Sequence, residues 1–362
     1  MTRVVVVGAG LIGMLSAREL VKAGMDVTLL DKGAAGGESS WAGGGILSPI
    51  YPWRYPEAVL QLARIGHRDY ESLASTLQDE SGLDPEWTKS GMLILDTQET
   101  DKAAVWSGQY GIKCQLTEEA ELRSLEPGLS PHFQQALWLP GVAQVRNPRL
   151  VKSVRESVRS LGVDLQEGES VTEILHESGK VTGVRTDSGL ITADKVVIAG
   201  GAWSATLLSS LGVDIQVEPV RGQMLLFKAQ PGQIRQIILS QGHYIIPRRD
   251  GHVLMGSTME HVGFDKSTTE LALDELKAAA IEIMPQLAEC VIEKHWAGLR
   301  PGSPTGIPYI GEHPRVSGLY VNAGHFRNGV ILAPASCKLL ADLMLGRATE
   351  LDAAPYALTT PH

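Results

Sequence analysis

The sequence predicts an α/β fold: a Rossmann-like dinucleotide-binding domain joined to a second, mostly antiparallel β domain that would bind the substrate. A glycine-rich turn between a buried strand and a helix opens the chain. Further apolar strand patterns recur much later, and short β-rich segments follow residue 217. This order indicates that both domains are discontinuous. We expect the dinucleotide domain at 1–80, 146–216 and 297–362, and the second domain at 81–145 and 217–296.

The composition is that of a soluble globular protein long enough for two domains. The chain has 362 residues, of which 43% are apolar and 20% charged, so a sizeable core is available. A net charge of −9 disfavours nucleic acid and anionic membranes as partners. The three cysteines are sparse and lack metal-ligand spacing, so we expect a reducing cytoplasm, no disulfide framework and no metal.

The N-terminal segment predicts one β-α-β unit. Val4–Val7 is a β-branched run of the kind found in parallel strands buried on both faces. A helix is expected over Leu11–Ala23, with Gly24 as its C-terminal cap. A second strand follows at Val27–Leu30 and ends at Asp31. The apolar run at the start is interrupted by glycine and too short to span a bilayer, so we expect neither a targeting nor a membrane segment.

Periodic patterns predict further elements along the chain. Helices are expected at 56–80, from Asn147 as cap with Pro148 at the first helical position, at 270–288 and over Gly329–Leu345. Strands are expected at Met92–Leu95, Leu165–Gln166, Val171–Leu175, Val181–Thr186, Asp194–Ala199, Met224–Phe227, Tyr244–Pro247, Val253–Gly256 and Leu319–Asn322. The small residues of 32–45 predict a close-packed loop without a regular element.

The glycine motif at the first turn points to a dinucleotide. In Gly8-x-Gly10-x-x-Gly13 the three glycines respectively permit a tight turn, backbone approach to a pyrophosphate, and close helix–strand packing. The helix N-terminus would then offer amide donors to phosphates. Asp31 is placed to accept hydrogen bonds from ribose hydroxyls, which favours FAD or NAD over NADP. The alternative is a glycine turn that binds nothing.

The segment after Asp31 favours FAD over NAD. An NAD-binding half would continue with regular βα units, whereas this loop is rich in small residues and suits a chain that wraps an extended cofactor. Glu38-Ser39-Ser40 offers polar groups for phosphates, and Gly43-Gly44-Gly45 allows the backbone to approach a ring edge.

Several motifs resemble the D-amino-acid oxidase superfamily of FAD-dependent oxidoreductases. Besides the N-terminal unit, these are SSWAGGGILSP at 39–49, DKVVIAGGAWS at 194–204 and AGHFRNGVILAPA at 323–335. Two segments, HWAGLRPGSPTGIPYIG at 295–311 and GHFRNG at 324–329, resemble more narrowly the glycine oxidase branch associated with thiamine biosynthesis. The similarity spans nearly the whole chain.

The resemblance implies a non-covalent, extended FAD with its adenine end at the N-terminal unit. It suggests Asp31 on the ribose, Ser39 and Ser40 near the pyrophosphate and Val171 near adenine. The expected cofactor residues are Gly8, Gly10, Leu11, Ile12, Gly13, Asp31, Lys32, Ser39, Ser40, Gly43, Gly44, Gly45, Ile46, Val171, Gly200, Trp203, Arg300, His325, Phe326, Arg327, Asn328, Gly329, Val330 and Ile331.

Arg300 is the expected anchor for a substrate carboxylate. Its guanidinium can make two parallel charge-assisted bonds, and the flanking glycines with Pro301 predict a turn that aims it into a cleft. The resemblance assigns it this role, against the alternative of an interdomain salt bridge. By the same resemblance Tyr244 would donate its hydroxyl to that carboxylate, against the alternative of strand packing. Arg327 would lie near the flavin as a further catalytic residue.

The rim of the substrate pocket is less well defined by sequence. Ile46 and Met259 match family positions there, although Met259 is equally explained as core. Relatives carry a histidine two residues before the tyrosine, where this chain has Gly242. The adjacent His243 should face away from Tyr244 by strand alternation. The aromatic residues Tyr51, Trp41, Trp53 and Trp296 would roof the cavity or pack in the core.

The resemblance implies oxidation of glycine, and more slowly of sarcosine or small D-amino acids, by hydride transfer to flavin. The products would be an imine that hydrolyses to a 2-oxo acid and ammonia, and hydrogen peroxide from oxygen. The implied setting is thiamine thiazole synthesis by a cytoplasmic homo-oligomer, a tetramer by resemblance. The alternatives are a sarcosine oxidase, a D-amino-acid dehydrogenase with a non-oxygen acceptor, and a non-catalytic flavin-binding subunit. Sarcosine oxidases often attach flavin to a cysteine within the segment matching 299–303, which here has none.

Overall fold

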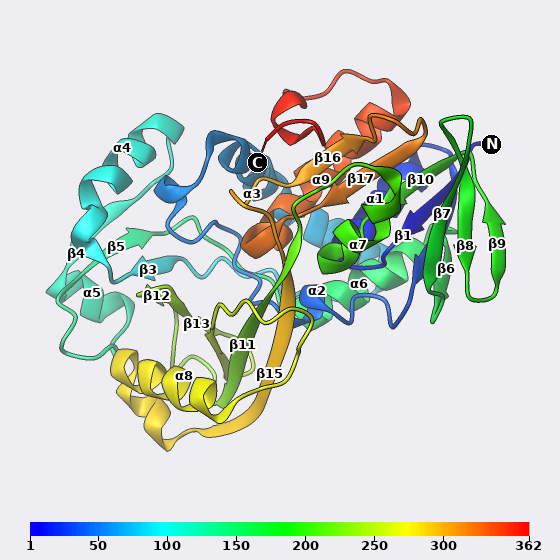
Figure 1. The fold of residues 1–362 in the computed structure, drawn as a ribbon. Coiled ribbons are helices and arrows are strands. Elements are labelled where there is room, and N and C mark those ends of the chain that lie inside the picture. The colour runs from blue at the N-terminus through cyan, green and yellow to red at the C-terminus, as the bar shows by residue number, and fades with distance from the viewer. Residues whose placement is uncertain (362) are drawn as a thin grey trace.

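Three β-sheets organise residues 1–361, the part of the chain that the computed structural model describes (Figure 1). A six-stranded, mainly parallel sheet has the strand order β16-β17-β10-β1-β2-β6. An eight-stranded sheet has the order β15-β11-β14-β13-β12-β3-β5-β4, and a three-stranded sheet the order β7-β8-β9. The predicted α/β class is confirmed, with the parallel and antiparallel sheets in separate parts of the molecule.

The parallel sheet is built around the first strand. β1 (Arg3–Val7) pairs in parallel with β2 (Asp26–Asp31) on one side and β10 (Lys195–Ile198) on the other. Its valines are almost fully buried, because both faces of the sheet are covered, as the uninterrupted β-branched run predicts. The sheet is completed by β6 (Asp164–Glu167), β17 (Leu319–Ala323) and the antiparallel β16 (Tyr309–Glu312).

Helices cover one face of this sheet. They are α1 (Leu11–Lys22), α3 (Glu57–Ser81), α6 (Asn147–Ser160) and α9 (Gly329–Leu345). The segment Phe326–Leu345 is long and apolar enough to cross a membrane, but 67% of its most apolar window is buried inside the fold. It packs on α3 so closely that a Cβ at Gly66 would lie 1.9 Å from the Ile331 carbonyl oxygen. α9 is therefore a core helix.

The other face carries the three-stranded sheet and a short helix. These are β7 (Val171–Glu177), β8 (Lys180–Thr186), β9 (Gly189–Thr192) and α7 (Ser204–Leu208). β9 is absent from the sequence prediction because it is a largely exposed strand with no apolar alternation.

The eight-stranded sheet forms the second part of the molecule. Its long pair is β11 (Glu218–Lys228) with β15 (Val291–Gly302), and every neighbouring pair is antiparallel except β3 with β12. The remaining strands are β3 (Met92–Ile94), β4 (Gln115–Glu118), β5 (Gln135–Leu139), β12 (Ile237–Ser240), β13 (His243–Pro247) and β14 (His252–Gly256). α8 (Glu270–Ile283) packs on one face, and α4 (Thr100–Tyr110) and α5 (Glu119–Leu125) lie near the β4 end. Strand β15 spans the predicted domain boundary between residues 296 and 297. The division of the chain into these two domains therefore stays a prediction.

Four local predictions are wrong, and the first three concern a turn, a loop and a helix cap. Residues 298–302 are the end of strand β15, not a turn; β15 is an edge strand, where Pro301 is tolerated because its missing N–H need not join a ladder. The loop after β2 contains the short helix α2 (Ser39–Ala42). Asn147 does not cap α6, because its side chain instead donates a hydrogen bond of 2.7 Å to the Ser40 carbonyl oxygen.

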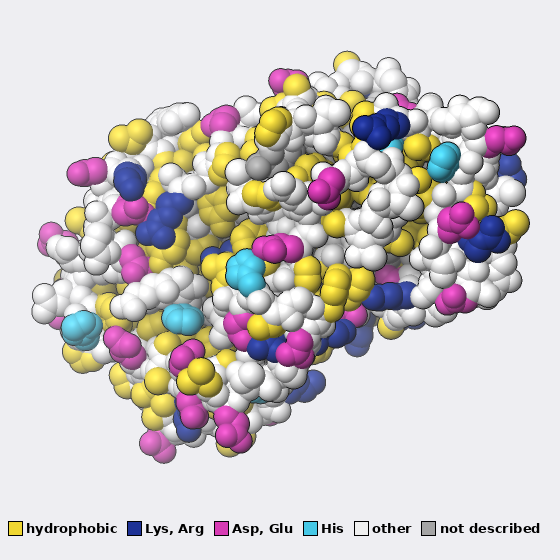
Figure 2. Space-filling view, in the orientation of Figure 1, with side chains coloured by type: hydrophobic (Ala, Val, Ile, Leu, Met, Phe, Trp, Pro, Cys, Tyr) yellow, Lys and Arg dark blue, Asp and Glu magenta, His cyan; other side chains and the backbone are white. Residues whose placement is uncertain are grey.

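The predicted helix 270–288 is also shorter in the structure. It ends at Ile283, and Pro285–Glu289 forms a separate 3-10 turn, since proline disfavours a helical residue before it. Over the face in Figure 2, acidic and basic side chains are interspersed and form no single basic stripe.

Candidate active site

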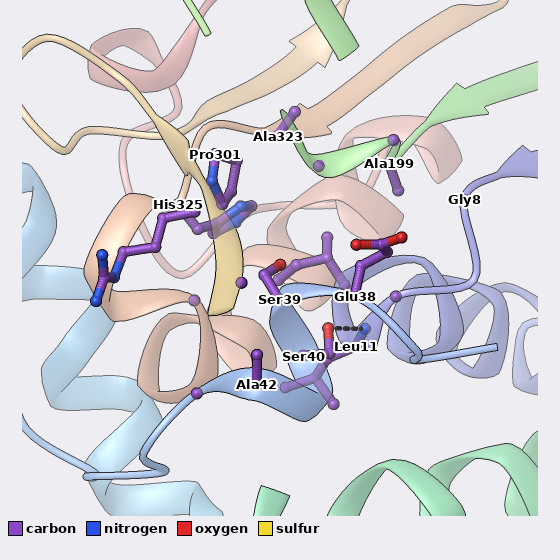
Figure 3. Close-up of a pocket in the computed structure, with 18 of the residues that line it drawn as sticks. Gly8, Leu11, Glu38, Ser39, Ser40, Ala42, Ala199, Pro301, Ala323 and His325 are labelled. Atoms are coloured by element: carbon purple, nitrogen blue, oxygen red, sulfur yellow. Dashed lines mark hydrogen bonds between the residues drawn. The ribbon is translucent and has the colours of Figure 1, made fainter. Parts of the chain in front are cut away.

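One elongated cavity runs between the parallel sheet and the eight-stranded sheet (Figure 3). Its volume is about 390 Å³, within the 300–1,000 Å³ typical of small-ligand pockets. The lining begins at the β1–α1 turn and ends at the 322–330 segment, and β11, β13 and β15 contribute from the second sheet. The cavity therefore suits a long ligand that touches both parts of the molecule.

The three glycines of the first turn have different surroundings. Gly8 has a φ of 101°, and a Cβ there would lie 2.5 Å from the Ala199 carbonyl oxygen. A Cβ at Gly13 would lie 1.8 Å from the Gly8 carbonyl oxygen, so this glycine is required by packing and does not line the cavity. Gly10 is the open one: only Ser40 Oγ, at 3.3 Å, would contact its Cβ. Gly8 thus makes the turn and Gly13 allows the packing, while the approach of a pyrophosphate at Gly10 stays a prediction.

Helix α1 points its N-terminus into the cavity. The Leu11 amide donates to Ser40 Oγ at 2.9 Å, which joins α1 to α2 at the cavity wall (Figure 3). The first turn of a helix also carries a partial positive charge. The site thus presents amides, serine hydroxyls and a helix N-terminus, which together suit a diphosphate.

Asp31 lines the cavity at the end formed by the β1–α1 turn, and backbone amides hold its carboxylate. Its Oδ2 accepts from the Ala9 amide at 2.7 Å, and its Oδ1 from the Gly33 amide at 2.8 Å. Burial raises the pKa of this carboxyl, and the two amide hydrogen bonds oppose that shift. Nearby, the Lys32 ammonium lies 3.5 Å from the centre of the Trp203 ring, and burial lowers the pKa of Lys32.

At the opposite end, Arg300 reaches the cavity from β15. Its Nη2 donates to Ser257 Oγ at 2.6 Å, and its Nη1 to the Thr258 carbonyl oxygen at 3.2 Å. Both partners are neutral, and among residues 1–361 no carboxylate forms an ion pair with Arg300. Burial lowers its pKa, while Tyr244 opposes that shift. An unpaired guanidinium in a cavity is a site for an anion.

The space for Arg300 comes from a glycine on the neighbouring strand. A Cβ at Gly222 of β11 would lie 2.2 Å from both terminal nitrogens of the guanidinium. Sequence reasoning missed Gly222, although a glycine inside a strand does signal a close approach. It also missed Met224, whose Sδ accepts a hydrogen bond of 3.3 Å from the Tyr244 hydroxyl.

Tyr244 and Arg327 also line the cavity near Arg300. Tyr244 is 7% exposed, and its ring packs against Gly44 and Gly256. Arg327 lies in the 3-10 turn Phe326–Asn328, is half-buried, and has no ion pair within the described part of the chain. Ile46 joins them on the wall. The structure thus places two unpaired arginines and a tyrosine at one end of the cavity.

Most of the predicted cofactor residues line this cavity, but some do not. Gly13, Asn328 and Ile331 lie outside the lining, as does Met259, which is 51% exposed. His243 does not line it either. The proposed aromatic roof is likewise absent from the lining: Trp41 packs on Trp296 with ring centres 5.7 Å apart, and Tyr51 on Trp53 at 6.1 Å.

The residues present fit an FAD. Gly10 leaves backbone open at the cavity wall, where a long ligand would need close approach, and Gly44 lines the same cavity. Three lining residues carry buried polar atoms without a hydrogen-bond partner, namely Glu169 Oε2 near Val171, Asn322 Oδ1 and His325 Nε2. The parallel sheet carries a glycine turn, the N-terminus of α1 and the acid Asp31 at one end of the cavity, and the second sheet closes the cavity. This combination defines a dinucleotide-dependent enzyme.

Comparison with known proteins identifies the family. The DAO family model, described as FAD dependent oxidoreductase, matches residues 3–343, so the chain belongs to that family. It is 50% identical over 356 residues to a glycine oxidase of Pseudomonas aeruginosa, covering 98% of both chains. It is 32% identical to a bifunctional ThiO/ThiG protein of Nostoc sp., covering 97% of this chain and 54% of that one.

The fold is also that of a solved relative. The crystal structure of glycine oxidase from Geobacillus kaustophilus matches with a TM-score of 0.95 at 30% identity, covering 100% of both chains. The resemblance drawn from the sequence motifs is therefore confirmed, and FAD is the cofactor of the family.

Proposed function

We propose that this protein is an amino-acid oxidase that converts glycine, and more slowly sarcosine or small D-amino acids, using non-covalently bound FAD. The observation that carries the proposal is Arg300, a guanidinium without a carboxylate partner at the end of the cavity opposite the dinucleotide turn. The similarity to glycine oxidases along the whole chain supports the same substrate class.

The proposed FAD lies along the cavity. Its adenosine end would contact Asp31, Glu169 and Val171, and its diphosphate the N-terminus of α1 with Ser39 and Ser40. Its ring end would lie against the 43–46 and 324–330 segments. Non-covalent binding is supported by the lining, which includes none of the cysteines.

In this arrangement Arg300 binds the substrate carboxylate through two parallel hydrogen bonds, and Tyr244 donates its hydroxyl to the same group. Two anchors on one carboxylate fix its orientation, so the remaining pocket wall directs the Cα–H towards the ring end. Arg327 adds positive charge there. When bound, FAD supplies a two-electron acceptor that returns its electrons to oxygen.

The chain need not supply a base for Cα–H cleavage. The substrate's Cα–H bond breaks with its electron pair leaving as hydride, while the neutral amine forms the C=N bond and then loses a proton. Water hydrolyses the imine, so glycine, oxygen and water give glyoxylate, ammonia and hydrogen peroxide. His325 is no substitute base, since burial lowers its pKa to about 3.

We place the enzyme in the cytoplasm as a homo-oligomer, a tetramer by family resemblance, supplying an imine for thiamine thiazole synthesis. The bifunctional ThiO/ThiG relative, of which this chain covers about half, supports that role. Light scattering of the purified protein tests the tetramer.

The test of the activity is anaerobic stopped-flow mixing of the yellow protein with glycine, sarcosine, D-alanine and D-proline, followed by air. Rapid bleaching by glycine with prompt reoxidation supports a glycine oxidase. Bleaching by sarcosine in preference to glycine would favour a sarcosine oxidase. Bleaching only by larger D-amino acids, or reoxidation much slower than dye reduction, would favour a D-amino-acid dehydrogenase. No bleaching by any amine would indicate a non-catalytic flavin-binding subunit.

A further inference from the structure

Arg248 is a buried cation to which the proposed chemistry gives no role. It follows β13 at the start of the turn to β14 and is 6% exposed. Two acids whose charges act on it, Glu86 and Asp250, pair with Arg146, at 3.4 and 2.7 Å, and Glu86 also pairs with Arg149 at 3.0 Å. Within residues 1–361 Arg248 has no ion pair of its own. A buried charge without a counterion is costly unless hydrogen bonds compensate it.

Three neutral acceptors hold the Arg248 guanidinium. Nη2 donates to the Gly44 carbonyl oxygen at 2.7 Å, and Nη1 donates to Gln144 Oε1 at 2.6 Å and to the Val145 carbonyl oxygen at 2.9 Å. Burial lowers the pKa of Arg248 to about 10, so the side chain remains charged at neutral pH. The charge therefore lies directly behind the backbone of Gly44, a residue that lines the cavity.

The cavity tyrosine on β13 and this arginine directly after β13 lie on the same side of the chain. Tyr244, Ile246 and Arg248 are spaced by two residues and so face the same side of the chain. A Cβ at Gly44 would lie 2.7 Å from Ile246 Cδ1 and 3.1 Å from Tyr244 Cε2. Together with the hydrogen bond from Arg248 to the Gly44 carbonyl oxygen, these contacts hold Gly44 against the strand that carries Tyr244.

Residues 144–145 hold the glycine loop 43–45 from another side. The Gly45 carbonyl oxygen accepts from the Val145 amide at 2.9 Å, and Ile46 pairs with Gln144 in an antiparallel bridge. Arg248 bonds to both Gln144 and Val145, so it ties β13, the 144–145 segment and the glycine loop together.

We propose that Arg248 is a positioning residue that fixes the Gly43–Gly45 loop against the ring end of FAD and places a buried positive charge there. The proposal rests on the proposed placement of the ring at this loop. A cofactor that accepts a hydride gains an electron pair, and a fixed positive charge in a low-dielectric site stabilises that electron-rich form. Arg248 would therefore raise both the affinity for FAD and its reduction potential.

The test compares Arg248→Met and Arg248→Lys with the exposed neighbour Arg249→Met as the matched control. The dissociation constant of FAD is measured by fluorescence quenching on the apoprotein, and the midpoint potential by dye equilibration on the holoprotein. Arg248→Met should raise the dissociation constant roughly tenfold or more and make the potential more negative. Arg248→Lys keeps the charge but lacks the planar fork, so it should weaken FAD binding while largely preserving the potential. Arg249→Met should change neither.

A wild-type dissociation constant and potential in Arg248→Met would overturn the proposal. If that variant fails to fold, Arg248→Lys decides, since unchanged FAD binding in it would equally overturn the positioning role. Failure of the proposed function looks different. In that case glycine does not bleach the wild-type protein, yet the potential and FAD affinity still shift in the Arg248 variants.

Discussion

At the dinucleotide end of the cavity the glycine turn, the helix N-terminus and the acid come from one short stretch of chain, whereas the substrate end gathers residues from strands far apart in sequence. At the first end Gly8, Gly10 and Asp31 belong to a single β-α-β unit, and Asp31 is held by amides of that same unit. At the second end Tyr244 comes from β13 and Arg300 from β15. Local backbone geometry makes the first site, and strand register makes the second.

The two ends also differ in charge. The dinucleotide end offers backbone amides and a helix N-terminus, and Asp31 is satisfied without a ligand. The substrate end holds Arg300 and Arg327, neither of which has an ion pair among residues 1–361. The difference suggests that the first end selects by shape, while the second is completed by the charge of its ligand.

The largest effect is expected from Arg300→Met. Removing the carboxylate anchor should lower kcat/KM for glycine about 10³-fold, equivalent to about 4 kcal/mol, with the affinity for FAD changed less than about threefold. Arg300→Lys should lose less, because it retains the charge. Steady-state kinetics and FAD titration measure the two quantities. Equal losses of FAD affinity and activity would contradict the separation between the ends.

Two glycine substitutions should affect the dinucleotide end differently, one through folding stability and the other through FAD affinity. Gly13→Ala places a methyl 1.8 Å from a backbone oxygen and should cost about 3 kcal/mol of folding stability. Gly10→Ala meets only a serine hydroxyl at 3.3 Å, so it should fold normally but weaken FAD binding about tenfold. Urea unfolding and FAD titration separate the outcomes. The same response from both variants would contradict the distinct surroundings of the two glycines.

The pH dependence of stability should report on the substrate end through His325. Its pKa falls from 6.5 to about 3 on burial, so folding favours the neutral imidazole. Its contribution to the free energy of unfolding is therefore complete above pH 6.5 and is lost as the pH falls towards 3. At pH 5 the loss is about 2 kcal/mol. His325→Gln should therefore lose less stability than the wild type between pH 7.5 and 5. Equal losses in urea midpoints measured at saturating FAD would argue against this assignment.

The smallest effect is expected from Tyr244→Phe. The ring that packs on Gly44 and Gly256 remains, and only the hydroxyl is lost. One hydrogen bond is worth about 1 kcal/mol, so KM for glycine should rise about five- to tenfold with kcat little changed. Steady-state kinetics on glycine measures this. An unchanged KM would mean that the hydroxyl, which donates to Met224 in this structure, does not reach the substrate.

Sequence alone predicted the regular elements wherever the periodic signal was long. The valines of β1, the helix after them and α9 agree with their predicted bounds to within one or two residues, because each has an uninterrupted apolar pattern. The same reasoning failed at 298–302. Two glycines and a proline predict a turn, but pairing with β11 makes an edge strand of it. Tertiary context overrides local propensity where a neighbouring strand supplies the hydrogen bonds.

By itself the sequence determined the β-α-β unit, the family and the cofactor class, since these depend on spacing within a few residues or on motifs. Only the tertiary structure decided which side chains share the cavity. Gly222 makes room for Arg300, and Arg248 supports Gly44, through contacts between residues far apart in the chain. The same folding leaves Met259 outside the wall. Strand register and side-chain direction set these contacts, and neither leaves a periodic trace in the sequence.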